Sequence, residues 1–285
     1  MPIERQPFQQ IGPLVAADGA DRQPFHGTHL PLGSSARDLS DPRPDANRWS
    51  ANTGFLWPHL PFCDRIRAAA AAGFDAVEFH DEAQRTDPAV LHAALRDAAL
   101  PVLSLNVAMG ATGGRAAMRG AEDDARRDVD AALALADGIG TRAVHVLAGR
   151  TGDPDLGQFV RVLRHAAGST DRTILIEPLC SAAAPGYALP TLDLAIRVQD
   201  DVGAPNLRIL FDYYHIETAH GGAADLFRRH RARIGHVQIA SVPARTAPAA
   251  ATHAFIDACR RAGWTAPFGC EYRPEGPDIR PPGRS

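Results

Sequence analysis

The run Leu207-Arg208-Ile209-Leu210-Phe211-Asp212 has the length of a strand, is mostly apolar and ends on a carboxylate. Three other runs share this form, residues 173–177, 234–238 and 267–271, and they end on Glu177, Gln238 and Glu271. Successive end residues are 35, 26 and 33 positions apart, which is room for one helix and one strand in each interval. Parallel strands joined in this way bring their last side chains to one rim of a barrel, where the active sites of such barrels lie.

The rest of the chain supplies the other strands of a closed barrel. Four further strands are predicted at residues 49–54, 76–79, 102–106 and 143–147. Helical periodicity predicts seven helices, at residues 62–72, 88–98, 121–139, 155–167, 191–202, 223–231 and 252–262. Gly73, Gly140, Gly203 and Gly263 follow four of these helices, where a left-handed cap favours glycine. The fold class is therefore α/β, a (β/α)8 TIM barrel.

The two ends of the chain depart from this pattern. Residues 1–46 are rich in Pro, Gly and polar side chains and lack apolar periodicity, so we expect a flexible extension before a barrel domain at residues 47–285. After Glu271 the chain contains three prolines from Pro277 onward, which exclude a regular helix over most of that segment. The eighth helix that would close the barrel is expected to be missing or replaced.

Composition excludes several classes of function. The net charge of −3 and the pI near 6.4 argue against nucleic acid and anionic membranes as partners, and we expect a cytoplasmic protein. The chain contains no lysine, which excludes a Schiff base with pyridoxal phosphate (PLP) or a sugar, and also a P-loop. No Gly-x-Gly-x-x-Gly follows the first strand, so no nucleotide cofactor is expected.

The four strand ends predict a metal site. Glu177, Asp212 and Glu271 would place three carboxylates together, with the amide of Gln238 beside them. Carboxylates crowded in this way repel one another unless a hard divalent cation lies among their oxygens. We therefore expect Mg²⁺ or Mn²⁺ as the cofactor.

Five other residues are candidates for binding substrate. His215 and Arg245 follow strands six and seven and would supply positive charge to an anionic substrate, because three carboxylates around a divalent cation leave a net negative charge. His145, Asn52 and Asn106 lie in or at the ends of other strands and could bind substrate oxygens, although core packing or turn formation would also explain them.

Four motifs carry a resemblance to a known family. They are Ala72-Gly73-Phe74-Asp75-Ala76-Val77-Glu78-Phe79, His145-Val146-Leu147-Ala148-Gly149, His236-Val237-Gln238-Ile239-Ala240 and Gly269-Cys270-Glu271-Tyr272-Arg273-Pro274. Over residues 48–274 the chain resembles the hydroxypyruvate isomerase family of the xylose-isomerase-like barrels, within the sugar phosphate isomerase/epimerase superfamily. The long N-terminal extension and the short proline-rich tail depart from that family.

The resemblance implies specific roles. Residues matching Glu177, Asp212, Gln238 and Glu271 hold a divalent cation in that family, and the two glutamates are the catalytic acid and base. Residues matching His215 and Arg245 contact substrate in related isomerases and epimerases. The implied reaction is the aldose–ketose type interconversion of hydroxypyruvate and tartronate semialdehyde through an enediolate.

Several alternatives share this fold and cation. A 2-oxo-tetronate isomerase, a keto-sugar epimerase and a keto-inositol dehydratase, which is a lyase, would use the same metal site. A barrel that binds a sugar acid without turnover is disfavoured, because binding alone does not require the pair Glu177 and Glu271. The expected partner is a small hydroxy-keto acid, and a homodimer is also expected.

Overall fold

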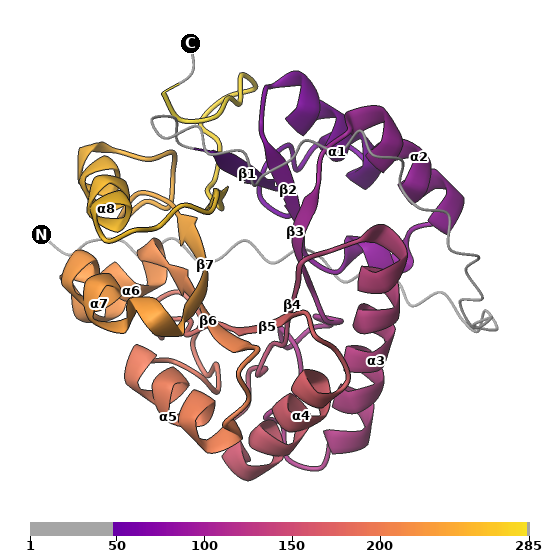
Figure 1. The fold of residues 1–285 in the computed structure, drawn as a ribbon, viewed down its shortest axis with the longest axis vertical. Helices are drawn as coiled ribbons and strands as arrows, with labels where there is room; N and C mark the ends of the chain where they lie inside the picture. Colours follow the sequence, from indigo (N-terminus) through magenta and orange to yellow (C-terminus); the bar gives the residue numbers. More distant parts are fainter. Residues whose placement is uncertain (1–47, 284–285) are drawn as a thin grey trace, which may run out of the picture.

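The computed structural model describes residues 48–283, and the predicted extension at residues 1–46 lies outside them. Eight parallel strands form a closed barrel in chain order, with β1 paired to β8. The strands are β1 (Trp49–Asn52), β2 (Ala76–Phe79), β3 (Val102–Asn106), β4 (Ala143–His145), β5 (Thr173–Ile176), β6 (Leu207–Asp212), β7 (Ile234–Ile239) and β8 (Phe268–Cys270). The predicted TIM barrel is confirmed, and Figure 1 shows the strands inside a ring of helices.

Eight α-helices surround the described barrel. They are α1 (Phe62–Ala71), α2 (Pro88–Ala98), α3 (Glu122–Ile139), α4 (Leu156–Gly168), α5 (Leu192–Val202), α6 (Tyr213–His220), α7 (Ala223–His230) and α8 (Ala250–Arg261). Within residues 48–283, none is both long and apolar enough to cross a membrane.

The eight helices do not alternate one by one with the eight strands. Both α6 and α7 lie between β6 and β7, and no helix follows β8 in the described part of the tail. The expectation of a missing closing helix is thus confirmed, and α6 is a helix that the sequence analysis did not predict. In the tail, the side chains of Tyr272 and Ile279 are buried, so this non-helical segment packs against the barrel near β8.

Local sequence explains why the helices begin and end where they do. The Thr191 side chain accepts a hydrogen bond from the Leu194 backbone N–H at 3.3 Å and caps α5 at its start. Gly203 ends the same helix in the left-handed region with φ 71°. A similar cap begins α6, because the Asp212 side chain accepts from the Tyr214 N–H at 2.8 Å. The turn from β6 into α6 therefore orients one of the predicted metal ligands.

An aromatic cluster joins the last strands to the helices outside them. Phe255 of α8 stacks on Phe211 of β6 at 5.9 Å between ring centroids, and it contacts Phe227 of α7 edge-on at 6.0 Å. Trp264 and Phe268 extend the cluster toward β8. This packing supports β6, which carries Asp212, and β8, which Glu271 follows.

Candidate active site

The four predicted ligands lie at the carboxyl ends of four consecutive strands. Glu177 follows β5 directly, Asp212 ends β6, and Glu271 follows β8 directly. Gln238 is the next-to-last residue of β7, and strand register pairs it with Asp212. All four side chains are buried. The rim expected from the sequence is therefore formed by these residues.

Arg245 connects two of these carboxylates. Its Nη2 lies 3.1 Å from Asp212 Oδ2 and 2.5 Å from Glu271 Oε2. The guanidinium carbon is 4.5 Å from the ring centre of Phe55 and 4.9 Å from that of Tyr214, so the cation lies between two aromatic faces. These contacts hold a residue whose own backbone is left-handed, with φ 55°.

Glu271 has the most hydrogen-bond donors of the carboxylates. Asn52 Nδ2 donates to Glu271 Oε1 at 3.0 Å, and His80 Nε2 lies 3.4 Å from the same oxygen. Burial would raise the pKa of Glu271, but Arg245 and His80 outweigh it and lower that pKa to about 2. Glu271 is therefore ionised throughout the physiological range.

The other two carboxyl groups shift in the opposite direction. Burial raises the pKa of Asp212 to about 7, with Arg245 opposing the shift and Glu271 adding to it. Burial and then the charges of Glu271 and Asp212 raise the pKa of Glu177 well above its usual value. One arginine does not compensate three carboxylates in this space, so the cluster retains protons that a cation would displace.

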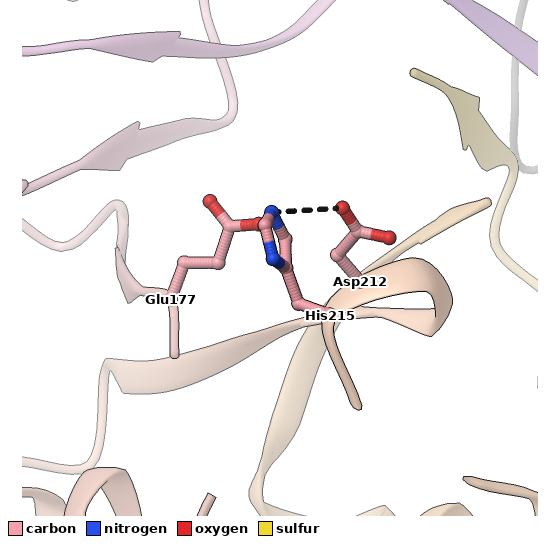
Figure 2. Close-up of side chains that lie close together, drawn as sticks. All are labelled: Glu177, Asp212 and His215. Atoms are coloured by element: carbon pink, nitrogen blue, oxygen red, sulfur yellow. Dashed lines mark ion pairs between the residues drawn. The ribbon is translucent and has the colours of Figure 1, made fainter. Parts of the chain in front are cut away.

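His215 is a neutral hydrogen-bond donor. Its Nδ1 accepts from the Cys180 backbone N–H at 3.3 Å, which leaves the imidazole proton on Nε2, 3.7 Å from Asp212 Oδ2 (Figure 2). Burial, followed by the charge of Arg245, lowers the pKa of His215 to about 3. The sequence analysis expected a positive charge on both His215 and Arg245. His215 is neutral near pH 7, so Arg245 is the one of the two that is positively charged.

His145 and Asn106 form a pair beside Glu177. The Asn106 side-chain oxygen accepts from His145 Nδ1 at 3.1 Å, and His145 Nε2 lies 3.9 Å from Glu177 Oε2. Burial lowers the pKa of His145 to about 3, so this imidazole is also neutral. Asn106 thus reaches the carboxylates through His145, whereas Asn52 contacts Glu271 itself.

The donor atoms fit a hard divalent cation. Glu177, Asp212 and His215 offer atoms that lie within 4.8 Å of one another, as Figure 2 shows for the side chains. Because His215 Nε2 carries a proton, the carboxylates are the better ligands of this group. Glu177 Oε1 and Gln238 Oε1 are buried oxygens without a hydrogen-bond partner among residues 48–283, which suits oxygen ligation by Mg²⁺ or Mn²⁺.

Three contacts of this site were missed by sequence reasoning. His80 directly follows β2, whose end at Phe79 agrees with the predicted strand, but it was passed over because the rule selected only oxygen-bearing side chains at strand ends. No sequence pattern marked Phe55 and Tyr214 as site residues, because their contact with Arg245 depends on where the fold places that arginine. The sequence also left open whether Glu78 contacts the site, and in the structure it accepts a hydrogen bond from Gln238 at 2.8 Å.

Comparison with known proteins agrees with this architecture. Residues 66–284 match the family model described as xylose isomerase-like TIM barrel. The chain belongs to this family. A 2-oxo-tetronate isomerase of Cupriavidus necator is 36% identical over 245 residues, covering 80% of this chain and 93% of that relative. A Xenopus laevis protein named "Putative hydroxypyruvate isomerase" is 31% identical over 255 residues, covering 82% and 92%.

Two solved structures have the same fold. A Brucella melitensis structure described as AP endonuclease, family 2, superposes with a TM-score of 0.77 at 30% identity, covering 82% of this chain and 96% of that one. A 3-keto-D-glucoside 4-epimerase from E. coli has a TM-score of 0.67 at 19% identity, covering 81% and 94%, and supports the fold alone. Because the relatives described above are named as isomerases, we conclude that this member of the family is an isomerase.

Proposed function

We propose that this isomerase acts on short 2-oxo acids that carry a hydroxyl on carbon 3, and that it interconverts hydroxypyruvate and tartronate semialdehyde with a divalent cation. The observation that carries the proposal is Arg245, a buried cation held at a rim of carboxylates. An uncharged sugar would not require such a group, whereas a substrate carboxylate would be repelled without it. The Arg245 Nε is buried without an acceptor, so it suits a substrate carboxylate oxygen.

Glu177, Asp212, Gln238 and Glu271 are the residues that would hold Mg²⁺ or Mn²⁺. When bound, the cation would polarise the substrate carbonyl and acidify the adjacent C–H group. The aromatic faces of Phe55 and Tyr214 fix the direction of Arg245, so the carboxylate end of the substrate is oriented before reaction.

Glu177 and Glu271 are proposed as the acid–base pair. One carboxylate removes the proton from carbon 3 of hydroxypyruvate, which gives an enediolate spanning carbons 2 and 3. A proton is then delivered to carbon 2, and the hydroxyl proton of carbon 3 passes to the oxygen on carbon 2. Carbon 3 thereby becomes the aldehyde and carbon 2 the alcohol. No redox cofactor is needed, because the two carbons exchange oxidation state within one molecule. The Nε2–H of His215 is a suitable donor to a substrate oxygen during this transfer.

A second substrate is favoured by the relatives. Two proteins named 2-oxo-tetronate isomerase, at 36% and 34% identity, precede the hydroxypyruvate isomerases in similarity. That four-carbon acid presents the same carboxylate, 2-oxo group and 3-hydroxyl, so the same residues could perform the same transfer. The two substrates differ only in the group attached to carbon 3.

Nuclear magnetic resonance in deuterated water tests the proposal. Metal-stripped protein is mixed with hydroxypyruvate or 2-oxo-tetronate, before and after addition of Mg²⁺ or Mn²⁺, and the Glu271→Gln variant is compared with Glu122→Gln. Glu122 lies on α3 in ion pairs with Arg126 and Arg161, so its variant controls for loss of a glutamate charge. Cation-dependent isomerisation lost only in Glu271→Gln is expected.

Other results would redirect the assignment. Turnover of the four-carbon acid alone would replace hydroxypyruvate by the second candidate. Loss of water from a keto-inositol would indicate a lyase. Neither isomerisation nor deuterium exchange with either acid and either cation would refute the proposal.

A further inference from the structure

A carboxylate inside the barrel holds the amide of Gln238. Glu78 of β2 is almost fully buried, with 1% of its surface exposed, and its Oε2 accepts from Gln238 Nε2 at 2.8 Å. β2 and β7 are separated by β8 and β1 in the closed sheet, so this bond crosses the barrel interior. It links two strands that are not neighbours, and a cation ligand is one of its partners.

The bond decides which end of the amide remains for ligation. The Gln238 Nε2 group donates a hydrogen bond to Glu78. Gln238 Oε1 is buried and has no hydrogen-bond partner within the described residues 48–283. Only the carbonyl oxygen of a glutamine side chain binds a hard cation, because the NH₂ group has no available lone pair. Glu78 Oε2 is the acceptor of this bond, so it favours the orientation in which Gln238 turns its NH₂ group toward Glu78.

The neighbours of Glu78 are fitted to this arrangement. His236, two residues before Gln238 on β7, brings its Nε2 to 3.1 Å from Glu78 Oε1. Gly269 of β8 leaves the space that the carboxylate occupies, because a Cβ there would lie 2.4 Å from Glu78 Oε1 and 2.8 Å from Gln238 Cγ. A histidine on β7 and a glycine on β8 thus border the carboxylate where it meets the amide.

We propose that Glu78 is a positioning residue that fixes the Gln238 amide with its carbonyl oxygen directed to the divalent cation. The inference rests on the proposed cation site and adds to it a residue outside the ligand set. Glu78 acts through Gln238, so its removal changes cation affinity while the four ligands remain in place.

The test measures Mn²⁺ binding by calorimetry without substrate. Glu78→Gln keeps the size of the side chain but introduces an NH₂ group, which allows the Gln238 amide to reverse. We expect binding to weaken by about 10- to 100-fold, the usual effect of removing a group that orients a ligand. The double variant Glu78→Gln/Gln238→Glu should recover most of this loss, because the amide then donates from position 78 and a carboxylate oxygen faces the cation. Glu122→Gln is the matched control and should bind as wild type does.

A second readout does not depend on the cation. In proton–nitrogen spectra of wild-type protein without metal, one Gln238 side-chain amide proton should be shifted downfield and protected from exchange by its bond to Glu78. The signal is identified by its absence from the single variant Gln238→Glu, and it should lose its protection in Glu78→Gln.

The outcomes separate this inference from the proposed function. Wild-type protein that binds no Mn²⁺ but shows the protected amide would refute the cation site. Equal Mn²⁺ affinity of wild type and Glu78→Gln would overturn the positioning role, as would an unprotected amide in wild-type protein. Failure of the double variant to recover affinity would also count against it.

Discussion

Mn²⁺ binding should strengthen steeply between pH 6 and pH 8. The pKa of Asp212 is raised to about 7 and that of Glu177 lies well above its usual value, chiefly because both carboxyl groups are buried. A carboxyl group binds a cation only after losing its proton, so protons compete with Mn²⁺ below these pKa values. Affinity therefore falls as the pH is lowered. Glu271, with a pKa of about 2, adds nothing to the effect in this range.

The size of the effect follows from the two raised pKa values. For Asp212 with a pKa of about 7, the proton penalty on binding is about 11-fold at pH 6 and about 1.1-fold at pH 8, a change of about tenfold. Burial and the charges of Glu271 and Asp212 also raise the pKa of Glu177, so its proton adds to the effect in the same direction. From Asp212 alone, the logarithm of affinity should rise with a slope near one at about pH 6 that falls toward zero at about pH 8, and Glu177 should steepen this rise.

Calorimetry in buffers of different ionisation enthalpy measures this release of protons directly. The observed heat should depend on the buffer, and Asp212 alone should release about half a proton for each Mn²⁺ bound at pH 7, with Glu177 adding to this number. Glu122→Gln should show the same dependence, because that residue lies outside the site. Equal affinities at pH 6 and pH 8, with heats that do not vary between buffers, would refute the electrostatic reasoning, since the ligands would then already be ionised.

Three further predictions concern substrate binding and stability. Arg245→Lys keeps the charge but not the flat contact between two aromatic rings, so KM for hydroxypyruvate should rise by about tenfold or more with little change in melting temperature, measured by steady-state kinetics and thermal unfolding. Asp81→Asn should lose its ion pair with Arg85. Burial alone would raise the pKa of Asp81, but Arg85 and a backbone N–H outweigh burial and lower that pKa. Its stabilisation is therefore present above its unfolded pKa and lost as pH falls through the folded value, and denaturant unfolding should show a difference from wild type that shrinks below about pH 4. Phe255→Ala should cost about 3–5 kcal/mol of unfolding free energy by emptying the aromatic cluster, again measured with denaturant.

The fold could be predicted because the strands and helices of a parallel barrel each have a clear pattern in the local sequence. Buried strands between two layers are continuous apolar runs, and each helix of the outer ring has one apolar face and a cap. The helix α6 was missed because its eight residues, Tyr213–His220, are too short for a clear period. The sequence analysis interpreted Asp212 only as a metal ligand, and the structure shows that its side chain also caps α6.

The site was predictable to the extent that strand ends determine it. Glu177, Asp212, Gln238 and Glu271 were found because each ends an apolar run, and that rule requires no knowledge of side-chain direction. Charge states were not predictable. His215 was given a positive charge, but its protonation depends on burial and on a hydrogen bond from Cys180, which is 35 positions away in the sequence. The roles of these residues in catalysis stay predictions.

The buried pair of Glu78 and Gln238 is costly for a barrel of this kind. The interior of a TIM barrel is usually filled by branched apolar side chains, and a buried carboxylate loses several kcal/mol of hydration. Apolar side chains of similar volume in place of a buried charged group are often neutral or stabilising by about 1–4 kcal/mol. Stability therefore does not explain a carboxylate that lies against His236 and above a glycine on β8. At the rim, Glu78 holds the Gln238 amide through a hydrogen bond, and besides burial its charge also contributes to the raised pKa of Glu177, so both effects of Glu78 connect it to the proposed cation site.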